Sequence, residues 1–375
     1  MHRARERQFP LVLVIALLLI AGCGRPTPET SVISPTATTA GDPHAASNEA
    51  ATSTVPPAPT PAPGSDGLSP DEVATLTSLK QVDDYPLYTM HYYGPYAQEP
   101  SSPTGDGVWT SGGVPVAWAC SLLAALGDPD NPLYGRNFDF DFSPALLLFT
   151  DPPDGYASVS MVDIAYLGFG GDISHQVAGL PLEERRALLA APLLPFDGMN
   201  NQGLAVGMAA VPPGDMRPEP GQATIGSLGV IREVLDHAST VDEAVAILDR
   251  YYINMAGGIP LHYLVADRSG HAVLVEFYQG ERFLFANEAP WHQATNFLRA
   301  AVEPSTAGQC WRYDLIQQQL EQAEGRLTPA EAMSLLAKVA QPETQWSIVY
   351  GLSTGEVHVV MGQAYDDVHA LSISR

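Results

Sequence analysis

A sharp change in composition near residue 67 limits how much of this 375-residue chain can fold. Between Gly24 and Gly67 the sequence is dominated by Pro, Ser, Thr, Ala and Gly, as in TSTVPPAPTPAPGSDG, with almost no bulky apolar side chain. Such a segment cannot bury enough apolar surface to offset the entropy that folding removes. We therefore expect residues 23–68 to form a disordered tether, and roughly 300 residues to fold as one large domain.

The first 22 residues have the layout of an export signal. Three arginines precede the apolar run Leu11–Ile20, and the small residues Ala21 and Gly22 lead to Cys23, which is typical of a signal peptide. The run is shorter than the about 20 apolar residues of a spanning helix, although a short uncleaved anchor remains the alternative. The ending Ile-Ala-Gly-Cys resembles the bacterial lipobox, which implies a lipid on Cys23 and an exported protein held at the extracytoplasmic face of the cell membrane.

The charge balance excludes one class of partner. The chain has 18 Lys and Arg against 42 Asp and Glu, which gives a formal net charge of -24. Nucleic-acid binding needs clustered cations, so we expect no nucleic-acid partner. An anionic membrane surface also repels such a body, so membrane attachment requires a dedicated anchor.

The motifs of several common sites are missing from the sequence. There is no G-x-S-x-G, P-loop or H-E-x-x-H pattern, and the ten histidines show no ligand spacing, so we expect neither a metal nor a cofactor. The run GFGGD at residues 168–172 lacks the G-x-G-x-x-G spacing and is interpreted as a turn. With Cys23 assigned to a lipid, Cys120 and Cys310 remain, and a disulfide between them is the ordinary interpretation for an exported protein.

Strand and helix patterns alternate after residue 69. A helix is predicted from Ser69 to Leu79, followed by an aromatic strand or hairpin over 83–96 and by buried strands on either side of residues 127–130. Hairpins are predicted over 262–277 and 346–362. The further helices are expected at 227–237, 240–251, 311–323 and 328–339. Ser69 is the predicted cap of the first helix, and capping boxes are predicted for Thr240 with Glu243 and for Thr328 with Glu331. This order favours an α+β fold of two sheets with helices outside.

Charged residues interrupt one of the apolar strands. The segment Gly135-Arg136-Asn137-Phe138-Asp139 begins shortly after Cys120 and places a cation and a carboxylate among apolar residues. Buried charges need partners. The pattern therefore indicates either a structural ion pair or a catalytic site that contains Cys120.

Four motifs in this order resemble the choloylglycine hydrolase and penicillin V acylase family of N-terminal-nucleophile (Ntn) hydrolases. The motifs are Cys120 with the G-R-N-x-D strand, residues 197–204 (DGMNNQGL, with Asn201 where the family has Glu), Thr295-Asn296, and Arg312 at the start of a helix. The resemblance implies a four-layer αββα sandwich that hydrolyses linear amide bonds of small N-acyl molecules. Residues 69–119 would be a pro-segment, and residues 120–375 the catalytic domain.

The same resemblance implies a role for each matching residue. The precursor would cut itself between Ala119 and Cys120, which frees an α-amine beside the thiol. Arg136 would stabilise the thiolate, and Asp139 would orient the amine. Asn296 would donate to the oxyanion, with Arg312 supporting the site.

The sequence departs from the family at one donor. Bile-salt-cleaving members have an Asn where this chain has Ala210, so a second oxyanion donor must come from the backbone or from Asn200. The identity of the acyl amide is left open. Two other functions remain: a non-catalytic ligand-binding surface lipoprotein with a Cys120–Cys310 disulfide, and an acyltransferase in which an amine intercepts the thioester.

Overall fold

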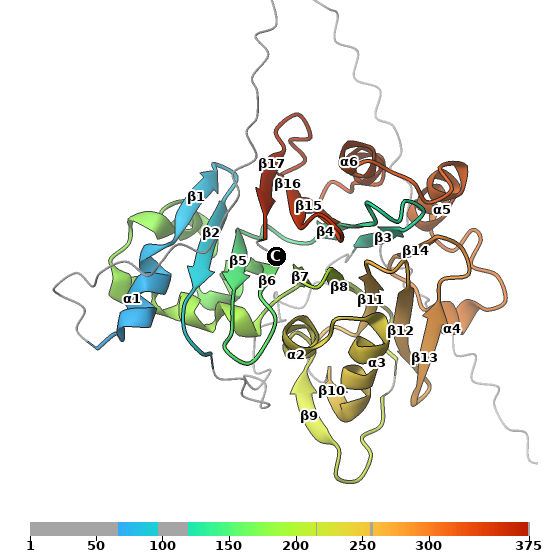
Figure 1. Ribbon diagram of the computed structural model, residues 1–375, viewed down its shortest axis with the longest axis horizontal. Coiled ribbons are helices and arrows are strands. Elements are labelled where there is room, and N and C mark those ends of the chain that lie inside the picture. Colours follow the sequence, from blue (N-terminus) through green and yellow to red (C-terminus); the bar gives the residue numbers. More distant parts are fainter. Residues whose placement is uncertain (1–66, 97–118, 215, 256–257, 374–375) are drawn as a thin grey trace, which may run out of the picture.

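The computed structural model describes residues 67–96, 119–214, 216–255 and 258–373 (Figure 1). The predictions on the export signal, on Cys23 and on the tether up to residue 66 fall outside these ranges, as does most of the segment just before Cys120. Leu68, predicted as the last residue of the tether, is instead buried in the core against α1. No helix in the described ranges is both long and apolar enough to span a membrane.

Two large β-sheets form the centre of the molecule (Figure 1). Nine strands make the larger sheet, antiparallel except for the β2–β5 pair. In spatial order they are β1 (Lys80–Asp83), β2 (Leu87–Tyr92), β5 (Ala145–Thr150), β6 (Ser158–Asp163), β7 (Asp197–Asn200), β8 (Leu204–Ala210), β11 (Leu261–Asp267), β12 (Ala272–Tyr278) and β13 (Glu281–Ala286). The first two of these strands come from the predicted pro-segment, which therefore forms one edge of the larger sheet.

The smaller sheet carries the segment that follows Ala119. Its six strands are all antiparallel. In spatial order they are β14 (Trp291–Ala294), β3 (Ser121–Ala125), β4 (Leu133–Asp139), β15 (Thr344–Gly351), β16 (Glu356–Met361) and β17 (His369–Ser372). A separate parallel pair joins β9 (Ala223–Gly226) to β10 (Tyr251–Asn254).

Helices cover the outer face of each sheet (Figure 1). The α-helices are α1 (Pro70–Thr77), α2 (Gly229–His237), α3 (Val241–Arg250), α4 (Arg299–Val302), α5 (Trp311–Gln322) and α6 (Pro329–Lys338). The 3-10 helices are η1 (Ile164–Leu167), η2 (Gly171–His175), η3 (Val177–Gly179) and η4 (Leu182–Leu193). Helices α5 and α6 pack on the smaller sheet, while α1, η4, α2 and α3 pack on the larger one.

The side chains of β3 contact the layers on both sides of the smaller sheet. Leu122 and Ala124 point into the core between the two sheets, whereas Leu123 and Ala125 point toward α5 and α6. Both faces are buried, so residues 122–125 form an unbroken apolar run rather than an alternating pattern. The four-layer α+β sandwich expected from the sequence is confirmed.

The helix caps follow the sequence closely. Reciprocal capping boxes open α1 at Ser69 and α6 at Thr328, each with Pro in the first turn. The box predicted at Thr240 forms on one side only. The Thr240 hydroxyl accepts from the Glu243 amide, but the Glu243 carboxylate accepts from Ser239 instead.

Candidate active site

Cys120 lies directly before β3, with a fully buried side chain. Strands β3 and β4 are antiparallel, and Leu122 pairs with Arg136. Cys120 and Leu122 share a face because side chains two apart on a strand do so. Arg136 Nη2 consequently lies 3.7 Å from Cys120 Sγ. The sixteen-residue spacing thus brings a guanidinium group against the thiol.

Arg136 is fixed by groups on the opposite sheet. Its Nη1 donates to Asp197 Oδ2 and to the Phe196 carbonyl oxygen, each at 2.7 Å. The other carboxylate oxygen of Asp197 accepts from the Tyr350 hydroxyl at 2.6 Å. Burial alone lowers the pKa of Arg136, but the attraction of Asp197 and of the Cys120 sulfur outweighs it and raises that pKa. A permanent positive charge therefore faces the sulfur.

The backbone of Cys120 is held from the other side of the smaller sheet. Arg312, in the first turn of α5, donates through Nη1 to the Cys120 carbonyl oxygen at 2.5 Å and to Ser121 Oγ at 2.8 Å. Its Nη2 donates to Asn296 Oδ1 at 2.8 Å. Arg312 thus connects the candidate nucleophile to the candidate oxyanion donor.

Asp139 has one satisfied oxygen and one that is not. Its Oδ1 accepts from Thr344 Oγ1 at 2.5 Å. Its Oδ2 is buried, lies 3.9 Å from Arg312 Nη1, and has no hydrogen-bond partner within the described part of the chain. Burial raises the pKa of this carboxyl to about 7, against the opposing pull of Arg312 and Thr344. Asp139 Oδ2 can therefore accept a further hydrogen bond.

The Asn296 side chain has one N–H group that no described hydrogen bond uses. Its Nδ2 donates to the Ala210 carbonyl oxygen at 2.8 Å, and its Oδ1 is occupied by Arg312. A primary amide has two N–H groups, and the described hydrogen bonds use one of them. The second is available to a developing oxyanion.

A buried carboxylate that the sequence motifs do not include supports the Asn296 turn. Glu276 on β12 accepts from the backbone amides of Arg299 and Ala300, both at 2.9 Å. His262 on β11 lies 3.1 Å from the same carboxylate. The only sequence feature that pointed to Glu276 as a buried, paired carboxylate was its place as a single acid in the apolar strand AVLVEFY. His262 lies opposite Glu276 in the predicted hairpin, whereas Arg299 and Ala300 belong to a separate segment whose position the sequence does not predict.

Asn200 does not provide the second oxyanion donor. Its Nδ2 donates to the carbonyl oxygens of Leu235 and Ala238, at 3.0 and 2.7 Å, so both amide hydrogens are used on α2 and its C-terminal end. Its Oδ1 accepts from the amides of Gln202 and Leu204. Asn200, predicted from the sequence as a possible oxyanion donor or turn residue, is therefore a turn residue here.

The turn that follows Asn200 needs glycine at one position. Gly203 has φ of +79°, and a Cβ there would collide with the Leu352 carbonyl oxygen. Only glycine adopts this conformation without strain. The motif over residues 197–204 thus combines a site residue, Asp197, with a structural turn.

Cys120 is a free thiol. The Cys120–Cys310 disulfide, left open by the sequence, is therefore absent. The described structure brings Cys120, Arg136, Asp139, Asn296 and Arg312 into one connected group. It places a thiol, two guanidinium groups, a carboxylate and an amide donor where they can serve nucleophilic attack on a carbonyl.

Sequence comparison adds one family. Residues 195–347 match the model of the acyl-coenzyme A:6-aminopenicillanic acid acyl-transferase family. This segment is less than half of the chain; it contains Asp197, Asn296 and Arg312, but not Cys120. No curated protein sequence matches the chain.

Several solved structures are similar to this one. A mutant of the conjugated bile acid hydrolase from Clostridium perfringens has 16% identity and a TM-score of 0.49, over 68% of this chain and 92% of that chain. Penicillin V acylase from Agrobacterium tumefaciens has 14% identity and a TM-score of 0.46, over 68% and 86% of the two chains. The Caenorhabditis elegans N-acylethanolamine-hydrolyzing acid amidase ortholog has 15% identity and a TM-score of 0.42, over 62% and 93%.

Proposed function

We propose that this protein hydrolyses a linear carbon–nitrogen amide bond of a small N-acyl substrate through a thioester on Cys120. One observation carries the proposal: the Cys120 sulfur faces a guanidinium group that a buried aspartate holds in place. A thiolate is the reactive form of cysteine, and a fixed cation favours it. The resemblance in sequence motifs supports the same reaction.

The nucleophile becomes active when the bond between Ala119 and Cys120 is cut. The new α-amine of Cys120 then serves as the base, because its ordinary pKa of about 7.7–8.0 lies close to that of a thiol, about 8.5. The unsatisfied Oδ2 of Asp139 is the acceptor for this amine. Before the cut no charged amine exists there, which explains an open acceptor in the uncut chain.

Turnover then follows the usual order of covalent catalysis. The amine takes the thiol proton, and the thiolate attacks the substrate carbonyl carbon. Asn296 Nδ2 donates to the oxyanion, with a backbone amide in place of the side chain that Ala210 lacks. The carbon–nitrogen bond breaks, the leaving amine takes the proton, and water hydrolyses the thioester to release the acid.

A panel of acyl amides tests the proposal. The cut protein is incubated with bile-acid amides, penicillin V, N-acyl homoserine lactones and fatty-acyl amides, and the released amine is measured. We expect turnover of at least one class and an acyl adduct on the chain that begins at Cys120. The matched control is Cys120→Ala. Equal turnover by this variant would overturn the proposal.

Acyl transfer is the second candidate, because the matching family model is that of an acyltransferase. The same thioester would then pass its acyl group to an amine instead of water. The assay is repeated with added 6-aminopenicillanic acid. Formation of an acylated amine in preference to the free acid identifies a transferase, whereas unchanged release of acid identifies a hydrolase.

We also propose that a lipid on Cys23 holds the protein at the extracytoplasmic face of the cell membrane. The apolar run before Cys23 and the polar tether after it support this location. Cys23→Ser is expected to move the protein into the aqueous phase or to leave it unprocessed. Unchanged partitioning into detergent by a variant chain that has lost residues 1–22 would contradict the lipid anchor.

A further inference from the structure

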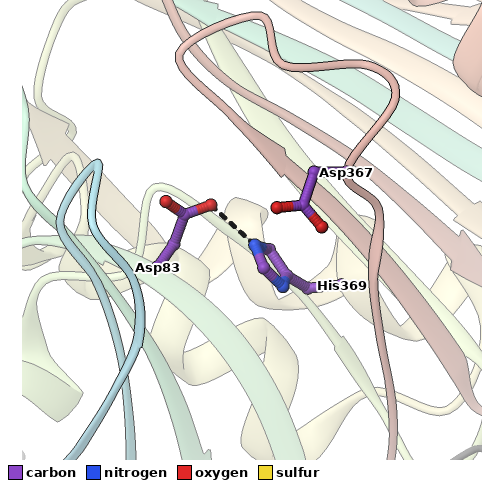
Figure 2. A group of neighbouring side chains, drawn as sticks. All are labelled: Asp83, Asp367 and His369. Atoms are coloured by element: carbon purple, nitrogen blue, oxygen red, sulfur yellow. Dashed lines mark hydrogen bonds and ion pairs between the residues drawn. The ribbon is translucent and has the colours of Figure 1, made fainter.

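Three potential metal ligands meet at the seam between the two sheets (Figure 2). Asp83 ends β1 at the edge of the nine-stranded sheet, and His369 begins β17 at the edge of the six-stranded sheet. Asp367 lies two residues before His369. One ligand atom from each residue lies within 4.8 Å of the other two. We call these three residues the seam cluster.

The orientation of Asp83 directs one oxygen at the imidazole. Its Oδ1 accepts from the Tyr85 amide at 2.8 Å, and its Oδ2 lies 2.6 Å from His369 Nε2. Figure 2 shows the Asp367 carboxylate turned toward the same imidazole. Asp83 and His369 each keep only 16% of their side-chain surface exposed, whereas Asp367 is exposed. The cluster is therefore sheltered on one side and open to solvent on the other.

Charge favours a cation at this position. Two carboxylates face one imidazole, so the cluster keeps a net negative charge even when the imidazole is protonated. The whole chain is also strongly acidic, with a formal charge of -24. A summed potential of this sign raises the local concentration of cations.

The segments that carry the three ligands are held by packing. Gly362, in the loop before Asp367, lies against the Tyr85 ring, and a Cβ on Gly362 would come within 2.6 Å of it. The Tyr85 hydroxyl donates to Gln345 Oε1 at 2.7 Å. His369 is paired with Val359 on the neighbouring strand. Ligands on fixed elements need little rearrangement to bind an ion.

We propose that Asp83, Asp367 and His369 bind one divalent cation of the Zn²⁺ or Mn²⁺ type. Imidazole nitrogen with carboxylate oxygens suits these ions better than Ca²⁺ or Mg²⁺, which prefer oxygen ligands alone. The ion replaces the proton between Asp83 and His369, with ligand distances of about 2.0–2.2 Å. Water completes its coordination on the open side.

The position gives the ion a structural role. Asp83 lies before the expected cut, and the other two ligands lie after it. If the proposed cut between Ala119 and Cys120 occurs, the ion connects the two resulting chains across the seam. Binding itself does not depend on the cut, because all three ligands are already together in the uncut chain.

Equilibrium dialysis of the full-length protein against Zn²⁺, Mn²⁺ or Ca²⁺, followed by metal analysis, tests the site. Asp366→Asn is the matched control, because it removes one exposed carboxylate next to the cluster but outside it. We expect His369→Gln and Asp367→Asn to bind one Zn²⁺ or Mn²⁺ fewer than the wild type, or to bind it at least about 10-fold more weakly. Asp366→Asn should bind like the wild type.

Asp367→Asn keeps the test valid if His369→Gln fails to fold, because Asp367 is exposed. The melting temperature is expected to rise with Zn²⁺ or Mn²⁺ in the wild type and in Asp366→Asn, but not in Asp367→Asn. Equal metal binding by the wild type and Asp367→Asn would overturn the proposal. Absence of binding, or binding of Ca²⁺ alone, would also overturn it.

Discussion

Two arginine–aspartate pairs lie on opposite faces of the strand that carries Arg136 and Asp139, and they differ in how completely they are paired. Arg136 and Asp197 meet at 2.7 Å, and Tyr350 occupies the remaining carboxylate oxygen. Arg312 and Asp139 approach only to 3.9 Å. In the first pair both carboxylate oxygens of Asp197 accept hydrogen bonds within the chain. The second leaves one buried oxygen of Asp139 without a hydrogen-bond partner among the described residues.

The pKa values follow the same division. Asp197 helps to raise the pKa of Arg136 above its usual range. Burial lowers the pKa of Arg312, and the attraction of Asp139 and Cys120 does not fully compensate. Two buried arginine–aspartate pairs can therefore differ in what they provide. The Arg136–Asp197 pair, called the closed pair, holds a fixed charge beside the thiol. The Arg312–Asp139 pair, called the open pair, leaves one Asp139 oxygen that can accept a further hydrogen bond.

The largest expected effect comes from breaking the closed pair. Arg136→Met leaves Asp197 buried without its cation, which should cost about 3–5 kcal/mol of unfolding free energy. Denaturant titration of the Cys120→Ala precursor with and without Arg136→Met measures this. Asp139→Asn is the matching change in the second pair, because Arg312 also donates to Cys120, Ser121 and Asn296 and its removal would break more than one contact. It should show no comparable loss, since the Arg312–Asp139 contact is 3.9 Å long. An equal loss of unfolding free energy would contradict the distinction between the two pairs.

The buried Asp139 carboxyl of the open pair should make the stability of the protein depend on pH. The pKa of Asp139 rises from 3.8 to about 7 on folding, so ionising it opposes folding. The penalty is absent below about pH 4, grows as the pH rises, and is complete above about pH 7, where it reaches at most about 4 kcal/mol.

Asp139→Asn should therefore stabilise the uncut Cys120→Ala protein at pH 8 and leave it nearly unchanged at pH 4. Denaturant titrations at the two pH values measure the difference. In the cut wild-type protein the α-ammonium compensates Asp139, so the same substitution should gain less there. A substitution that destabilises the uncut protein at pH 8 would contradict the open pair.

The two buried asparagines offer a third comparison. Asn296→Ala removes the reserved donor and is expected to lower kcat by about 10²–10³-fold, the usual effect of losing one oxyanion donor. Asn200→Ala is the matched control, since both of its amide hydrogens are used on the end of α2. It should lower stability while the correctly folded fraction keeps its kcat. Steady-state kinetics on both variants separates the two roles, and equal kcat losses would refute the assignment.

The smallest effect is expected from removing the Tyr350 hydroxyl group, which donates to Asp197 in the closed pair. Tyr350→Phe removes one hydrogen bond to the Asp197 carboxylate, worth about 1.5–3 kcal/mol for a charged acceptor. Thermal unfolding measures the loss. Activity should fall only slightly, because the Arg136–Asp197 contact remains. A collapse of activity at unchanged stability would mean that Tyr350 acts directly in the reaction.

The elements with local signals were predicted well from the sequence. The caps at Ser69 and Thr328 and the hairpins formed by β11–β12 and β15–β16 depend on residues near one another in the chain. The position of Arg136 beside the Cys120 thiol was implied by the family resemblance, and the pairing of β3 with β4 brings the two residues together. Such features are fixed by patterns a few residues long.

The remaining features depend on contacts between distant segments. Asp197 was found as part of a motif, but its pairing with Arg136 across the two sheets was not predicted. Asn200 has the residue type of an oxyanion donor, yet the position of α2 uses both of its hydrogens. The seam cluster joins Asp83 to His369 across most of the chain, so no spacing rule for metal ligands could reveal it.

The most direct test of the account is the N-terminal residue of the purified, active protein. Intact mass measurement and N-terminal sequencing should find a chain that begins at Cys120, with its amine free. The Cys120→Ala variant should remain a single uncut chain. Full activity in a wild-type protein whose bond between Ala119 and Cys120 is intact would contradict the central claim that the amine of Cys120 completes the open pair.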